Sequence, residues 1–272
     1  DAALTGLRRT GWVPVKNLVL NALKLPVIAV FAGGVPVYGI LLGWTIPGVA
    51  VAAAAAWVLL ARGLPSVAVE EERLRRREVT RYAAGNYAGY LCTVAYRMLP
   101  PIIVLREAGA DVAAIFYPPW LIATSLSLMV SNLSVSLVVE GAFQRERLAQ
   151  HARQALLQTA RIVLPLAVLL VVTAPWVLAI FGHAYSSEGA PLLRLLALGL
   201  VPGSVCILGF GLARVRDHVR SLIANQVLLA VLVLGPAVPL VHWLGVEGIG
   251  VSFLVGQCVV ALLLGLTELR PV

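Results

Sequence analysis

Long apolar runs separated by short polar stretches dominate the chain from residue 14 onward. Each run is about 20 residues or longer, which is the length that a helix needs to cross the hydrocarbon core of a bilayer. Strands of a membrane barrel would be about 10 residues long with alternating polarity, and the runs do not alternate. The pattern predicts an all-α, polytopic transmembrane bundle of eight spans, at residues 14–33, 36–61, 83–105, 112–139, 156–181, 191–213, 219–243 and 248–267.

The composition supports a membrane protein. Of the 272 residues, 60% are hydrophobic and only 12% are charged, and the mean hydropathy is +0.92. Several spans contain proline, which membrane helices tolerate when neighbouring helices satisfy the carbonyl groups that proline leaves free. The net charge of +8 does not indicate nucleic-acid binding, because the basic residues are spread over short connections instead of one face or one tail.

The basic residues alternate from one connection to the next. Connections on one side hold 16 of the 21 basic residues, the other side holds Arg106 alone, and four lie within spans. By the positive-inside rule, the rich side is cytoplasmic, which predicts a multi-pass protein of the cytoplasmic (inner) membrane with both termini cytoplasmic. The rich side comprises Arg8, Arg9, Lys16, Arg62, Arg73, Arg75, Arg76, Arg77, Arg81, Arg145, Arg147, Arg153, Arg214, Arg216, Arg220 and Arg270.

One span, 83–105, carries an arginine well inside it. Tyr82, Asn86, Tyr90, Thr93 and Arg97 are spaced 4, 4, 3 and 4, so a helix places them in one stripe. A guanidinium in hydrocarbon costs about 2.5–3.5 kcal/mol on insertion scales. The stripe is therefore expected to face the bundle interior or a water-filled cavity.

Two further spans carry polar stripes. Asn17, Asn21 and Lys24 share a face of the first span, and Tyr117 begins a run of serine and threonine on the fourth. Most of these hydroxyls are expected to bond to their own helix or to pack between helices. The candidate substrate-binding residues are Lys24, Arg97, Asn21, Asn86, Tyr90 and Tyr117. The alternative is that the first span starts after Lys24 and that Arg97 pairs with a structural carboxylate.

The sequence holds no pattern typical of an enzyme. It lacks an HExxH pair, a Walker sequence, a GxSxG element and a clustered carboxylate pair. We therefore expect no catalytic residue, no metal and no cofactor. The partners expected are membrane lipid and an anionic substrate, because the charges that could reach a buried cavity are positive.

Three stretches resemble a known family. They are "GWVPVKNLVLNALKL" at 11–25, "LAIFGHAYSSEGAPLLRLLALGLVPG" at 178–203 and "GVEGIGVSFLVGQ" at 245–257. Together they resemble polysaccharide flippases of the multidrug/oligosaccharidyl-lipid/polysaccharide exporter superfamily, whose members have two bundles of six helices. The resemblance implies that residues 1–61 are the last two helices of a truncated N-terminal bundle, 62–82 a cytoplasmic linker and 83–272 the C-terminal six-helix bundle. The missing N-terminal helices of the same protein would then be a partner.

By this resemblance, the protein moves a polyprenyl-diphosphate-linked oligosaccharide across the cytoplasmic membrane by alternating access. Lys24 and Arg97 would offset the cost of taking the diphosphate through a low-dielectric core. One alternative is a cation-coupled drug exporter of the same superfamily, which would need carboxylates within its spans. Others are a non-transport membrane subunit of a polysaccharide pathway and a glycosyltransferase or polymerase, for which the outer connections leave no room.

The charge pattern predicts which connections meet the outside. In a complete protein without native cysteines, a cysteine at Ser187 should react with an impermeant thiol reagent added to intact cells, and one at Arg76 should react only after lysis. The reverse labelling pattern would contradict the orientation.

Overall fold

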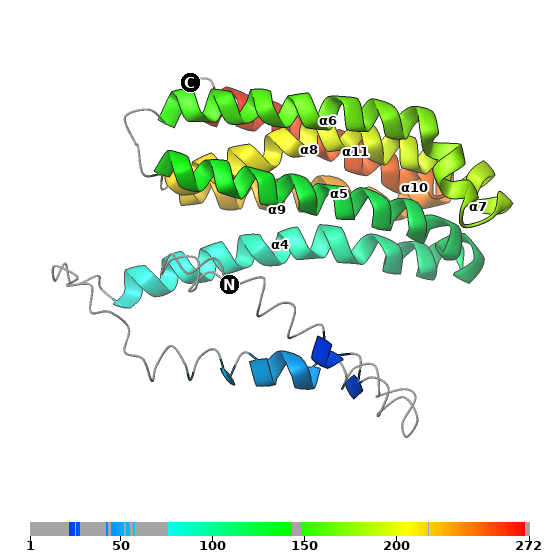
Figure 1. The fold of residues 1–272 in the computed structure, drawn as a ribbon, viewed down its shortest axis with the longest axis horizontal. Coiled ribbons are helices and arrows are strands. Elements are labelled where there is room, and N and C mark those ends of the chain that lie inside the picture. The colour runs from blue at the N-terminus through cyan, green and yellow to red at the C-terminus, as the bar shows by residue number, and fades with distance from the viewer. Residues whose placement is uncertain are drawn as a thin grey trace. The chain divides into compact units, whose positions relative to one another are not determined.

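A computed structural model describes residues 22–24, 26–27, 42, 45–51, 53–54, 57, 76–142, 148–216 and 218–269 of the chain. The chain divides into two compact units, Asp1–Arg73 and Leu74–Val272. The described residues of the first unit are all helical. Those of the second unit form a helical bundle (Figure 1).

The described part of the second unit contains helices and no strand. Six segments are long and apolar enough to cross a membrane, with α9 and α10 forming one of them. The protein is therefore an all-α, multi-pass membrane protein, as the apolar runs predict. The elements are α4 (Arg76–Ala108), α5 (Ala110–Ala142), α6 (Leu148–Ala179), α7 (His183–Glu188), α8 (Ala190–Val215), α9 (Val219–Leu234), α10 (Ala237–Leu244), α11 (Glu247–Leu264) and the π-helical turn η2 (Gly265–Leu269).

The six segments correspond in order to the predicted spans from 83–105 onward. The predicted spans 14–33 and 36–61 lie largely outside the described residues. Helix α4 starts at Arg76, so the last part of the predicted 62–82 linker is continuous with this helix. Arginine is a good helix former and no proline or paired glycine interrupts 76–83, which explains why the helix extends beyond the apolar run.

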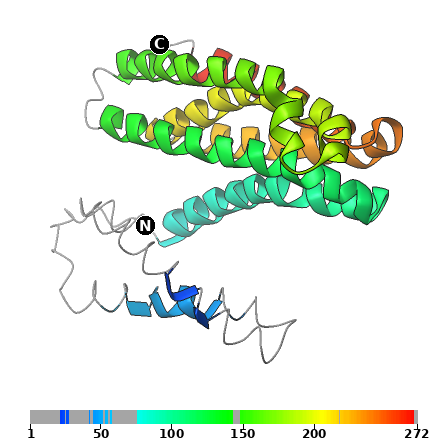
Figure 2. The ribbon, with the colours of Figure 1, turned by 45° about the vertical axis from the view of Figure 1, so that its right-hand side comes forward.

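Short connections make neighbouring helices antiparallel, so the unit has two ends. Helices α4 and α5 are joined through Gly109, whose φ of 87° is a conformation that glycine adopts without strain. Figures 1 and 2 show the long helices running alongside one another between the two ends. We call the end that carries α7 the α7 end, and the opposite end, where η2 closes α11, the Glu268 end.

Helices α8 and α11 form the centre of the bundle. About half of each apolar segment is buried, 56% for α8 and 50% for α11, compared with 22% for α4. Glycines on one helix meet large side chains on the other: Gly199 faces Phe253, Gly209 faces Leu264, and Gly250 faces Leu192. Small residues let helix backbones approach closely, and this contact replaces the hydrophobic driving force that lipid removes.

The junction between α10 and α11 is also close. A Cβ on Gly248 would overlap the backbone carbonyl of Leu240, whereas a Cβ on Gly265 would meet no atom within 4 Å. Because a backbone carbonyl cannot swing away as a flexible side chain does, this overlap forces α10 to shift.

We expect Gly248→Ala to destabilise the protein by about 1–3 kcal/mol, the usual cost of overpacking. Gly265→Ala serves as the matched control and should leave stability unchanged or slightly raised. Thermal unfolding of the purified protein in detergent measures both. Equal unfolding midpoints for the two variants would contradict the close approach.

Candidate functional site

Helix α4 carries the arginine that the sequence places well inside a span. Arg97 lies eleven residues before Ala108, which is the last residue of this helix and of its apolar segment. At about 1.5 Å per residue, the Cα of Arg97 is about 16 Å along the helix from that end. The predicted span ended at residue 105, so the observed helix places Arg97 three residues further from its last residue than the sequence suggested.

The side chain of Arg97 is half-buried and lies beside Tyr96. Its Nε donates to the Tyr96 hydroxyl at 3.4 Å, and its Cζ lies 5.9 Å from the centroid of that ring. None of the ion pairs between described residues includes Arg97. Within this part of the chain, the guanidinium of Arg97 therefore contacts an aromatic side chain and not a carboxylate.

A proline explains how the backbone at Arg97 is held. Pro101 has no N–H, so the carbonyl of Arg97 loses its partner within α4. The indole Nε1 of Trp120 on α5 donates to this carbonyl at 3.2 Å. Trp120 is almost fully buried and stacks on Phe116 with ring centroids 5.4 Å apart. A rigid aromatic cluster thus fixes the position of the turn that carries Arg97.

The six candidate residues have different surroundings. Tyr90 is 56% exposed and Tyr117 is 53% exposed. Tyr117 lies one turn before Trp120, which contacts Arg97, so Tyr117 and Arg97 occupy neighbouring turns of α5 and α4. Lys24 is half-buried among the described residues of the first unit. Asn21 and the side chain of Asn86 lie outside what the structure describes.

The exposed side chains of α4 and α5 include phenols as well as apolar groups. Tyr90 and Tyr117 are exposed, as are Met98, Ile102 and Leu121. Arg97 is half-buried on α4. The two phenols and Arg97, which we call the α4–α5 polar face, form the candidate functional site.

The hydroxyls near this face are bonded within their own helices. Thr93 donates to the carbonyl of Gly89 at 3.2 Å, Thr124 to that of Trp120 at 2.8 Å and Ser127 to that of Ala123 at 2.9 Å. These bonds agree with the expectation from the sequence that hydroxyls in the spans bond to the helix backbone. They leave Arg97 and the tyrosines as the groups most suited to contact a ligand.

Arg194 donates a hydrogen bond to a second carbonyl that a proline leaves without a partner in its own helix. Pro175 deprives the carbonyl of Val171 in α6 of its donor, and Nε of Arg194 on α8 donates to that carbonyl at 3.2 Å. The sequence alone suggests that Arg194 reaches for the membrane surface. Its observed contact is instead with the backbone of the neighbouring helix.

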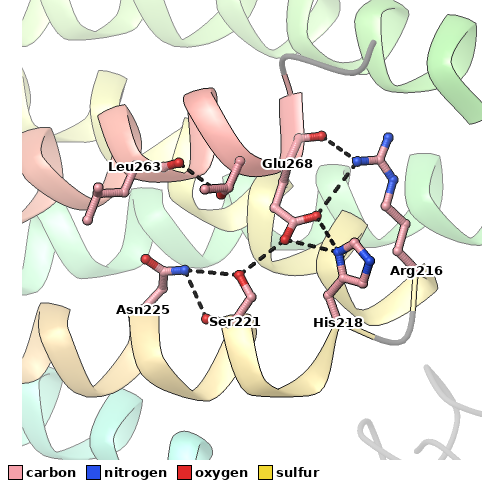
Figure 3. Close-up of polar contacts among 7 residues, drawn as sticks. Arg216, His218, Ser221, Asn225, Leu263 and Glu268 are labelled. Carbon is pink, nitrogen blue, oxygen red and sulfur yellow. Dashed lines mark hydrogen bonds and ion pairs between the residues drawn. The ribbon is translucent and has the colours of Figure 1, made fainter.

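The most extensive polar cluster surrounds Glu268, which sequence reasoning missed (Figure 3). The Glu268 side chain is only 2% exposed, and Nδ1 of His218 lies 3.1 Å from its Oε2. Ser221 donates to Oε1 at 3.1 Å, and Nη1 of Arg216 lies 3.7 Å from Oε2. Arg216 also donates to the backbone carbonyl of Glu268 at 2.7 Å, which satisfies one free carbonyl at the end of the helix.

This cluster, which we call the Glu268 clasp, fastens the end of α11 to the connection between α8 and α9. In the sequence, Glu268 looks like a boundary residue after the last span, and His218 looks like a loop residue. Their separation of 50 residues gives no periodic signal. The one indication in the sequence was that Glu268 follows an apolar run, on the side of the membrane where the connections are rich in arginine.

Comparison with protein-family models, curated proteins and solved structures found no match for this chain. Among the described residues, no group of three or more histidines, cysteines and acids is arranged to hold a metal. The candidate site therefore depends on the geometry of α4 and α5 alone.

The clasp gives a stability prediction. Glu268→Ala should destabilise the protein by about 3 kcal/mol, because Arg216 and His218 would lose the charge that faces them. Glu188→Ala on α7, where the side chain is exposed, should change stability by less than about 0.5 kcal/mol. Chemical unfolding in detergent compares the two, and equal stability would show that the buried carboxylate is not holding the bundle end.

Proposed function

We propose that this protein is a flippase that moves a polyprenyl-diphosphate-linked oligosaccharide across the cytoplasmic membrane. The observation that carries the proposal is Arg97, a guanidinium well inside a membrane segment, for which no ion pair with a carboxylate is found among the described residues. Charged groups at this depth are costly and usually serve a ligand or an ion path. An anion that has to enter the membrane would be stabilised by this guanidinium.

A diphosphate fits this chemistry. Guanidinium forms charge-assisted, often bidentate hydrogen bonds with phosphate oxygens. The two amino groups of Arg97 are not used in the contact with Tyr96, which involves Nε. The exposed phenols of Tyr90 on α4 and Tyr117 on α5 would offer hydroxyl and ring contacts to the attached sugar.

The same proposal includes a second cation and an orientation. Lys24, in the first unit, is the second residue proposed to help neutralise the diphosphate. The Glu268 end would be cytoplasmic, since it carries the arginine-rich connections. Alternating access would then expose the α4–α5 polar face first to the inside and later to the outside.

The positions of the acidic residues favour an anionic substrate over a cationic drug. A drug exporter coupled to protons or sodium needs a carboxylate within a span. The carboxylates whose side chains the structure describes lie at helix ends: Glu107, Asp111, Glu188, Glu247 and Glu268. Glu268, the most buried of them, is already surrounded by donors.

Substitution of Arg97 in the complete protein tests the proposal. Arg97→Ala should lower export of the lipid-linked sugar roughly tenfold to hundredfold, the factor expected for losing charge-assisted hydrogen bonds of about 1.5–3 kcal/mol. Arg97→Lys should keep part of the activity if charge is sufficient, and Arg97→Glu should be worse than alanine. Complementation of a flippase-deficient strain, scored by surface polysaccharide at measured protein levels, provides the readout.

Arg153→Ala is the matched control, because Arg153 is an exposed arginine on α6 away from the polar face. It should complement as well as the unmodified protein. Full complementation by Arg97→Ala at equal expression would end the proposal and favour a non-transport membrane subunit.

A further inference from the structure

The bundle has a histidine–glutamate pair at each end. At the Glu268 end, Nδ1 of His218 lies 3.1 Å from Glu268. At the α7 end, Nε2 of His242 on α10 lies 3.2 Å from Oε2 of Glu107 in the last turn of α4. Each pair joins segments that are far apart in the sequence. The two pairs have similar distances but different surroundings.

The pair at the Glu268 end has a permanent cation. The guanidinium of Arg216 contacts both the carboxylate and the backbone carbonyl of Glu268, and an arginine stays charged at any pH relevant to a protein. Ser221 adds a further donor. The carboxylate is therefore held whether or not His218 carries a proton.

The pair at the α7 end lacks such support. The only other cation near Glu107 among the described residues is Arg106, which is 85% exposed and 3.8 Å away. An exposed ion pair of this kind contributes little to the stability of a protein. The elements packed against α4 and α10 carry three further charged groups whose side chains the structure describes. Asp111 on α5 and Glu247 on α11 are acids at this same end, and Arg220 lies in the first turn of α9, at the opposite end. The imidazole of His242 is thus the principal positive group that this end can offer to Glu107.

Helix α10 is well placed to respond to this contact. It has eight residues and lies between a break at Gly235–Pro236 and a turn at Gly245, whose φ is 62°. Such a short helix depends on tertiary contacts for its position. Two buried side chains, Ala237 and Val241, pack inward, and the contact from His242 to Glu107 ties the helix to α4.

We propose that His242 and Glu107 form a proton-responsive latch that fastens α10 to the end of α4. Imidazole changes charge between pH 5 and 8. When His242 carries a second ring proton, it is a cation and donates to the Glu107 carboxylate. When that proton is lost, the ionic attraction is lost as well, so α10 is held less firmly. The Glu268 clasp, which keeps Arg216, does not share this dependence.

Hydrogen exchange of the backbone amides of α10 tests the latch in the full chain, in detergent or lipid nanodiscs. At pH 5.5, His242→Gln and Glu107→Gln should each speed exchange in α10 about two- to fivefold relative to the unmodified protein at the same pH. The double variant should be no faster than either single variant. At pH 8.0, all four proteins should exchange α10 at nearly the same rate.

Two further variants separate the latch from general loosening. His242→Lys keeps a cation at both pH values and should protect α10 at pH 8.0 better than histidine does. His218→Gln removes the other imidazole and should leave α10 unchanged at both pH values. Amides in α8 report whether the variants retain the fold. Equal effects of His242→Gln at the two pH values, or additive effects of the two single variants, would overturn the proposal.

Discussion

The need to satisfy every backbone polar group inside a membrane governs this structure. Hydrocarbon offers no hydrogen-bond partner, so each carbonyl that a proline releases needs a donor from elsewhere in the protein. Trp120 supplies one for the carbonyl of Arg97, and Arg194 supplies one for the carbonyl of Val171. Each bond crosses from one helix to its neighbour. At Pro101 and Pro175, the break in the helix hydrogen bonding thus creates a bond that joins two helices.

This constraint links the fold to the candidate site. Trp120, which donates to the carbonyl that Pro101 leaves free, belongs to an aromatic cluster with Phe116 and Phe253. Phe253 in turn packs against Gly199 in the central contact of α8 and α11. The turn that presents Arg97 is thus connected to the most buried part of the bundle. A cation held inside a membrane segment needs such rigid support, because any local movement would change its exposure to water.

The sequence predicts the helical class and the six later membrane segments, because apolar length is a local property that the bilayer imposes. The position of Arg97 inside a span is also visible in the sequence, and its spacing from Tyr90 and Thr93 places the three residues on one helix face. The Glu268 clasp could not be predicted. It joins residues 50 or so positions apart, and its strength comes from burial that only tertiary packing creates. The contact of Arg194 was missed for a similar reason, because it depends on which helix lies beside Pro175.

The clasp also has a consequence for biosynthesis. Arg216 leaves the ribosome 52 residues before Glu268, which corresponds to several seconds at about 5–20 residues per second. During this interval, the connection between α8 and α9 has no buried carboxylate to bind, and the glycines of α8 have no partner helix. The translocon or a chaperone would have to shield the half-built bundle until the last span arrives. Final assembly is therefore a late step that follows insertion of the earlier helices.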